Sequence, residues 1–123
     1  MTSRKIVAAL VLLVSLAACQ ARNDNPVPDH LVGVWKTSEP RYADRYVEIR
    51  HDIIIFGTGG ETFELHALMD IAETRAGESI VYTITHLNHS GQKYNLAFYY
   101  DPSTNGIIRF KNQREVAWTK ETD

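Results

Sequence analysis

The sequence predicts an all-β domain: a small antiparallel up-and-down meander of about eight short strands that closes into a barrel. From residue 31 to residue 120, short stretches rich in β-branched and aromatic residues alternate with clusters of Gly, Pro, Asn and Asp. Such short connections join antiparallel neighbours, so each strand is expected to pair with the one before it. An open meander would leave two unpaired edges, and closure into a barrel removes both.

Each expected strand follows from local composition. Residues 53–56 are wholly apolar and of strand length. Residues 79–87 alternate Ile, Val, Tyr and Thr, which favour strands. Turn-forming residues occupy 88–91 and 101–106. The complete set of expected strands is 31–37, 46–50, 53–56, 63–73, 79–87, 93–100, 107–111 and 116–120.

Segment 63–73 fits two periods. An apolar residue at every second position favours a strand, through Phe63, Leu65, Ala67, Met69 and Ile71. Helical spacing is also satisfied, by Leu65, Leu68, Met69 and Ala72, and these residue types favour helices. We prefer the strand because every neighbouring segment has β character.

The N-terminus has the order of a secretory export signal. Arg4 and Lys5 precede an apolar run over 6–18 that only Ser15 interrupts. The sequence Leu-Ala-Ala-Cys at 16–19 resembles the lipobox of bacterial lipoproteins, which implies cleavage between Ala18 and Cys19 and attachment of acyl chains to Cys19. The alternative is an uncleaved anchor, for which the run is shorter than the usual span of about 20 residues.

These features divide the chain into a signal peptide (1–18), a lipidated cysteine with a flexible tether (19–30) and a barrel domain (31–121). Cys19 is the only cysteine, so no disulfide can form within the chain. Lipoproteins that resemble this one carry more than one acyl chain, which makes membrane anchoring permanent. In the sorting pattern of such lipoproteins, Gln20 in place of aspartate implies the outer membrane, facing the periplasm.

Charge excludes one class of partner. Removal of residues 1–18 leaves 105 of the 123 residues, enough for one domain. It also leaves 11 of the 13 basic residues against 15 acidic ones, a net charge of −4. No basic cluster exceeds two neighbours, so we do not expect nucleic-acid binding.

Residues 31–35, Leu-Val-Gly-Val-Trp, resemble the Gly-x-Trp signature that opens lipocalins and related small barrels. The resemblance implies that Gly33 and Trp35 close one end of the barrel, with an arginine from the last strands stacked over Trp35. The candidate cations are Arg109, Lys111 and Arg114. Arg109 is the preferred one because it lies within the penultimate strand.

Catalytic, metal and cofactor motifs are not expected. His86 and His89 are three residues apart, and such positions on a strand face opposite sides; His51 and His66 lie elsewhere. No strand spacing pairs the acidic candidates Asp52, Glu64, Asp70 and Glu73. The glycines of 57–60 precede no phosphate-binding helix. We therefore expect a protein without enzymatic activity.

The aromatic residues lead to two functional hypotheses. Tyr94, Phe98 and Tyr100 share one strand face, next to Tyr82, and form either core or a ligand-lining group. The first hypothesis is a binding module for a small apolar or amphipathic ligand. The second is a filled barrel that docks on or inhibits an envelope protein. A cavity of about 300 Å³ favours binding, whereas a solid core with an exposed apolar patch favours docking.

Replacing the lipobox cysteine tests the anchor. Cys19→Ser should release the protein from membranes and leave its fold unchanged, because the acyl chains need the thiol. Carbonate washing of the membrane fraction and circular dichroism measure the two effects. A Cys19→Ser protein that stays in the washed membranes contradicts the lipobox interpretation.

Overall fold

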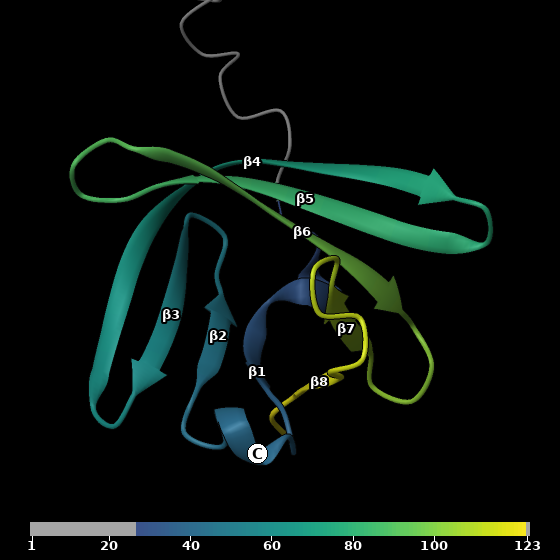
Figure 1. Cartoon of the computed structure of the whole chain (residues 1–123). Helices are drawn as coiled ribbons and strands as arrows, with labels where there is room; N and C mark the ends of the chain where they lie inside the picture. Colours follow the sequence, from purple (N-terminus) through teal and green to yellow (C-terminus); the bar gives the residue numbers. More distant parts are fainter. Residues whose placement is uncertain (1–26, 123) are drawn as a thin grey trace, which may run out of the picture.

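The computed structural model describes residues 27–122, which form an antiparallel barrel with its strands in sequence order (Figure 1). The barrel closes where Trp35 of the first strand pairs with Lys120 of the last. The strands are β1 (Gly33–Lys36), β2 (Tyr46–Ile49), β3 (Ile53–Gly59), β4 (Thr62–Ala76), β5 (Ser79–Leu87), β6 (Lys93–Asp101), β7 (Ile107–Phe110) and β8 (Trp118–Lys120). The predicted eight-stranded all-β barrel is confirmed.

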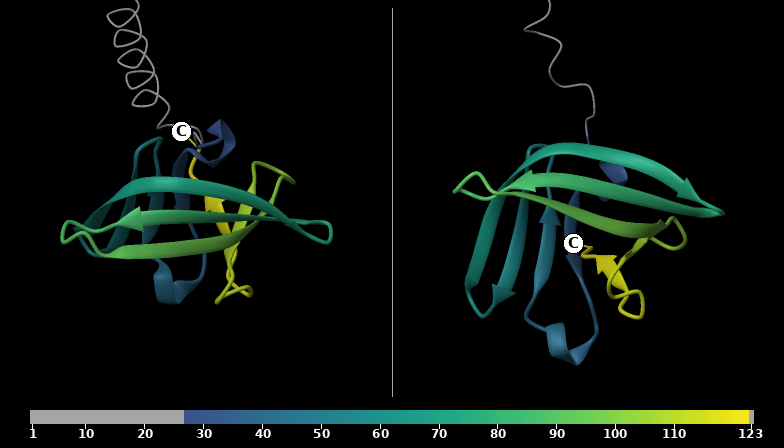
Figure 2. Two further views of the ribbon diagram at one scale, coloured as in Figure 1. Left: turned by 90° about the horizontal axis from the view of Figure 1, so that it is seen from above. Right: turned by 45° about the horizontal axis from the view of Figure 1, so that its top comes forward.

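Strand β4 turns the corner of the barrel. Its first half pairs with β3 and its second half with β5, and Ala67 pairs with both. The segment 63–73 is therefore a strand, as the alternation indicated, and not a helix. Figures 1 and 2 show β4 passing from the wall that holds β3 to the layer of β5 and β6.

A β-bulge between Leu68 and Asp70 changes which face of β4 points inward. Phe63 and Leu65, before the bulge, and Met69, within it, lie outside, each at least half exposed. After it, Ile71 is buried in the core, although it continues the same alternating series. Because of the extra residue, odd-numbered positions of β4 face outward before the bulge and inward after it. The alternating apolar residues therefore lie on both faces of the sheet.

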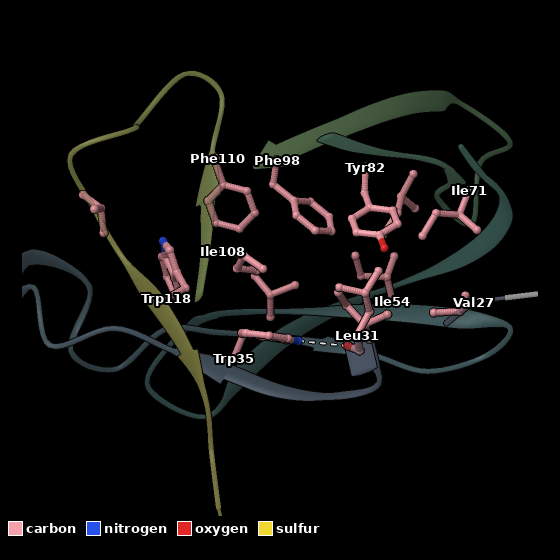
Figure 3. Packing of buried hydrophobic residues seen from close by; sticks show 14 residues of the cluster. Val27, Leu31, Trp35, Ile54, Ile71, Tyr82, Phe98, Ile108, Phe110 and Trp118 are labelled. Atoms are coloured by element: carbon pink, nitrogen blue, oxygen red, sulfur yellow. Dashed lines mark hydrogen bonds between the residues drawn. The ribbon is translucent and has the colours of Figure 1, made fainter. Parts of the chain in front are cut away.

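Side chains fill the barrel interior (Figure 3). Tyr82, Phe98 and Phe110 project inward from β5, β6 and β7 toward Trp35. Phe98 and Phe110 meet edge to face with ring centroids 6.3 Å apart. The largest fully buried side chains are those of Leu31, Trp35, Ile49, Ile54, Ile84, Phe98 and Ile108.

One end of the barrel is closed by the segment before β1. A short 3₁₀ helix, η1 (Asp29–Leu31), and the preceding Val27 place two buried apolar side chains over the core. The indole Nε1 of Trp35 donates a hydrogen bond to the Leu31 carbonyl at 3.0 Å. The expected boundary at residue 31 is thus wrong: residues 27–30 belong to the barrel rather than to a tether. The predicted signal peptide, Ala18, Cys19 and the start of the tether lie outside the described residues.

The cation over Trp35 is Lys120, and the prediction of Arg109 is wrong. The Lys120 Nζ lies 5.6 Å from the centre of the Trp35 ring. Arg109 sits between the inward-facing Ile108 and Phe110, so its side chain points out of the barrel. Gly33 has a φ of +146°, and a Cβ there would come within 2.8 Å of the Lys120 side chain. The glycine of the motif therefore gives this lysine its path to the indole.

Within residues 27–122, no helix has the length and apolar character needed to cross a membrane.

Removal of the Trp35 ring should destabilise the barrel strongly. Trp35→Ala is expected to lower the free energy of unfolding by about 3–5 kcal/mol, since it leaves a large cavity and frees the Leu31 carbonyl. Urea unfolding measures the change. Val34→Ala, on the neighbouring and less buried position of β1, should cost less than about 1.5 kcal/mol. Equal losses for the two variants would contradict the central position of Trp35.

Candidate functional site

The barrel end opposite η1 carries the candidate site. Helix η1 precedes β1, whereas a second 3₁₀ helix, η2 (Pro40–Tyr42), follows it, so the two lie at opposite ends (Figure 2). At the η2 end a pocket of about 350 Å³ opens to solvent. We call it the open-end pocket. Its aromatic lining residues are Tyr42, Tyr46, Phe56, Phe110 and Trp118.

Trp118, one of the lining residues, carries a buried hydrogen-bond donor that has no partner. Strand β8 pairs Trp118 with Ile108, which faces the core, and the Trp118 side chain is only 5% exposed. Among the described residues, its Nε1 is the buried side-chain nitrogen or oxygen that has no hydrogen-bond partner. A buried donor left unpaired costs about 1–3 kcal/mol. An acceptor that reached this Nε1 would recover that energy.

The connections around the pocket are tied to one another. The Gln113 Nε2, from the β7–β8 connection, donates a hydrogen bond to the Tyr42 hydroxyl at 2.7 Å. The Tyr42 ring lies 6.2 Å from the Trp118 ring. Phe110 meets Trp118 edge to face at 5.5 Å. Two aromatic rings, from η2 and β7, therefore lie against the Trp118 indole, and the hydrogen bond from Gln113 holds the Tyr42 ring in place.

Next to the pocket, Phe56 covers a buried pair of histidines. His66 and His86 place their Nδ1 atoms 2.8 Å apart, so one ring donates a hydrogen bond to the other. Phe56 lies 5.2 Å from one ring and 5.4 Å from the other, and Tyr94 stacks on His86 at 5.6 Å. Burial lowers the pKa of His86, and the electrostatic interaction with His66 lowers it further.

The sequence placed these histidines apart, and only the register of β4 against β5 brings them together. His51 and His89 are exposed. Among residues 27–122, no group of three or more His, Cys, Asp or Glu side chains is arranged to hold a metal ion. In the described part of the chain, His66 and His86 thus contribute a buried hydrogen bond between β4 and β5.

The four aromatic residues proposed to line a ligand site do not form one pocket. Tyr82 and Phe98 are core residues, 2% and 0% exposed. Tyr94 covers His86, and Tyr100 lies at the η1 end, where its ring is 4.7 Å from that of His30. Strand β6 does place Tyr94, Phe98 and Tyr100 on one face, but that face runs the whole length of the barrel.

Tyr82 belongs to the closed end. Its hydroxyl donates to the Glu73 carboxylate at 2.9 Å and lies 3.0 Å from the His30 Nε2. Burial, followed by the hydrogen bond to Glu73, raises the pKa of Tyr82 to about 12. Glu73 therefore accepts the hydrogen bond of a core hydroxyl. All four acidic candidates, Asp52, Glu64, Asp70 and Glu73, are exposed.

The residues that do line the open-end pocket were not singled out in the sequence. Trp118 carried the one available signal, an indole in a short alternating strand near the C-terminus. The position of Trp118 beside Tyr42 of η2, and its unpaired nitrogen, depend on contacts between segments that are distant in the sequence. No protein-family model, curated protein or solved structure matches the chain.

Acid should weaken the barrel through the histidine pair. The pKa of His86 is lower in the folded state, so the unfolded chain takes up the proton first, and stability falls as pH drops below about 6.5. Urea unfolding across pH 8 to pH 5, roughly, measures this slope. In His86→Gln the slope should be smaller, whereas His89→Gln, at an exposed turn position, should retain it. Equal slopes in all three proteins would refute this role of the pair.

Proposed function

We propose that the chain is a lipoprotein, anchored through acyl chains on Cys19 to the outer membrane and facing the periplasm, whose barrel binds a small amphipathic ligand at its open end. In this function the barrel carries out no chemical reaction. The lipobox residues 16–19 support the anchor. The aromatic pocket with its unpaired donor supports ligand binding.

The unpaired Trp118 Nε1 is the observation that carries the proposal. A ligand with a carbonyl, ether or carboxylate oxygen would accept its hydrogen bond, while Phe56, Phe110 and Tyr42 contact an apolar body. A volume of about 350 Å³ lies within the usual range for small-molecule pockets. Because side chains fill the interior, the ligand is held at the mouth of the barrel and not inside it.

Chain length would keep the barrel near the membrane, with the η1 end toward the anchor and the open-end pocket at the far end. Seven residues, 20–26, separate Cys19 from Val27, the first described residue and a buried one. Even fully extended, seven residues span only about 25 Å. An acylated Cys19 would therefore hold the barrel close to the bilayer, where amphipathic molecules are concentrated.

A second candidate function rests on the outer face of β4. Phe63, Leu65 and Met69 are 59%, 50% and 57% exposed on one side of the strand. Leu65 pairs with Ile55, which is 8% exposed and lies outside the core cluster. This apolar row is the type of surface that marks an interaction site, so docking on an envelope protein is the alternative.

Native mass spectrometry of residues 20–123, expressed in the periplasm, tests the ligand. All strand pairings lie within residues 27–122, so this piece contains the whole barrel. We expect a reproducible added mass that is lost on denaturation. In Trp118→Phe the retained ligand should fall about tenfold, because one hydrogen bond is lost while an aromatic ring remains.

The matched control is Trp35→Phe. Its Nε1 is already bonded to Leu31, so this variant should lose stability but keep the ligand. If the parent protein shows no added mass, or if Trp118→Phe retains as much ligand as the parent, binding at the open end is wrong and docking through β4 becomes the better hypothesis.

A further inference from the structure

A second pocket, which shares no lining residue with the first, lies between the tip of the β4–β5 hairpin, the end of β6, and β7. Its volume is about 470 Å³. Three arginines line it: Arg75, Arg109 and Arg114. We call it the arginine groove. Its two carboxylates are those of Glu78 and Asp101.

The arginines of this groove are not used in ion pairs. The salt bridges between described residues join Lys36 to Glu121, Arg41 to Glu39 and Arg50 to Glu48. None of them includes a groove arginine. The chain as a whole has a net charge of −2. Three guanidinium groups in one groove therefore form a local excess of positive charge in a chain whose net charge is negative.

Two of the three guanidinium groups are oriented by other contacts. The Arg109 Nη1 donates a hydrogen bond to the Arg114 carbonyl at 2.9 Å. The Arg114 guanidinium lies 4.6 Å from the centre of the Tyr99 ring. An arginine side chain has five donors, so each contact orients the group and leaves most of its donors available.

Asp101 is directed toward its own turn. Its Oδ1 accepts a hydrogen bond from the Ser103 backbone N–H at 2.9 Å. With Glu78 it offsets two of the three positive charges and leaves an excess of one. The groove therefore favours a ligand that brings negative charge, and Ser79 adds a hydroxyl to the lining.

We propose that the arginine groove binds a phosphate group. Guanidinium forks match phosphate oxygens with paired hydrogen bonds. A phosphate monoester carries a charge of about −1.5 to −2 at neutral pH, so it uses three guanidinium groups more fully than a carboxylate does. The phosphate belongs either to a lipid headgroup or to a soluble molecule, and the chemistry of recognition is the same.

Isothermal titration of the full chain in an uncharged detergent, with inorganic phosphate as the probe, tests the site. We expect saturable binding that weakens about tenfold in Arg75→Gln and in Arg109→Gln, since each loses charge-assisted hydrogen bonds. Arg50→Gln is the matched control, because it removes the same charge at an arginine paired with Glu48 outside the groove. It should bind phosphate as the parent does.

A second titration identifies the source of the phosphate. Short-chain phosphatidic acid, whose headgroup is a phosphate monoester, assigns a lipid headgroup if it binds more tightly than inorganic phosphate through the same arginines. Tighter binding of inorganic phosphate assigns a soluble ligand. Short-chain phosphatidylcholine controls for the acyl chains.

Two results overturn the proposal: no saturable binding of either anionic probe to the folded parent, or equal weakening by Arg50→Gln and by the groove variants. Circular dichroism establishes that each variant is folded. Arg75, which is exposed on β4, carries the test if Arg109→Gln is misfolded.

Discussion

The hydrogen bond between the Trp35 indole and the Leu31 carbonyl joins the two features on which the barrel depends. Trp35 pairs with Val47 of β2 on one side and with Lys120 of β8 on the other, so it sits where the barrel closes. Its ring fills the interior, and its nitrogen holds η1 over the end. The Trp35 side chain thus contributes both to the closure of the sheet and to the closure of the barrel end. The Lys120 side chain, which passes over Gly33, covers the same ring.

Because the interior is full, binding surfaces are left only at the ends and on the outside of the barrel. The open-end pocket, the arginine groove and the apolar row of β4 each lie where the core packing stops. They differ in chemistry: an aromatic mouth whose lining includes Trp118, a cationic groove, and an exposed apolar surface. On the proposed function, these surfaces would serve an amphipathic molecule, a phosphate and a protein contact without any change in the core.

The strands could be predicted from the sequence because alternation and turn residues are local properties, and residues 79–87 form a strand with the expected bounds. The faces of β4 could not, since the bulge at Leu68 reverses the parity on which the prediction depends. The cap formed by Val27 and Leu31, the His66–His86 pair and the unpaired Trp118 nitrogen were also missed, because each requires contact between segments distant in the sequence. Arg109 was chosen for its strand, but strand alternation points it outward.

The position of η1 has a mechanical consequence. Any tension applied to the chain from residue 26 reaches Val27 and Leu31 before it reaches a strand of the barrel. The first contacts loaded are apolar packing, the ring contacts and Tyr82 hydrogen bond of His30, and the Trp35 hydrogen bond, whereas the eight-stranded ladder is loaded only afterward. A pull on the chain before Val27 would thus lift the cap from the core while the barrel remained closed, so the η1 end is the part of this fold that yields first to such a force.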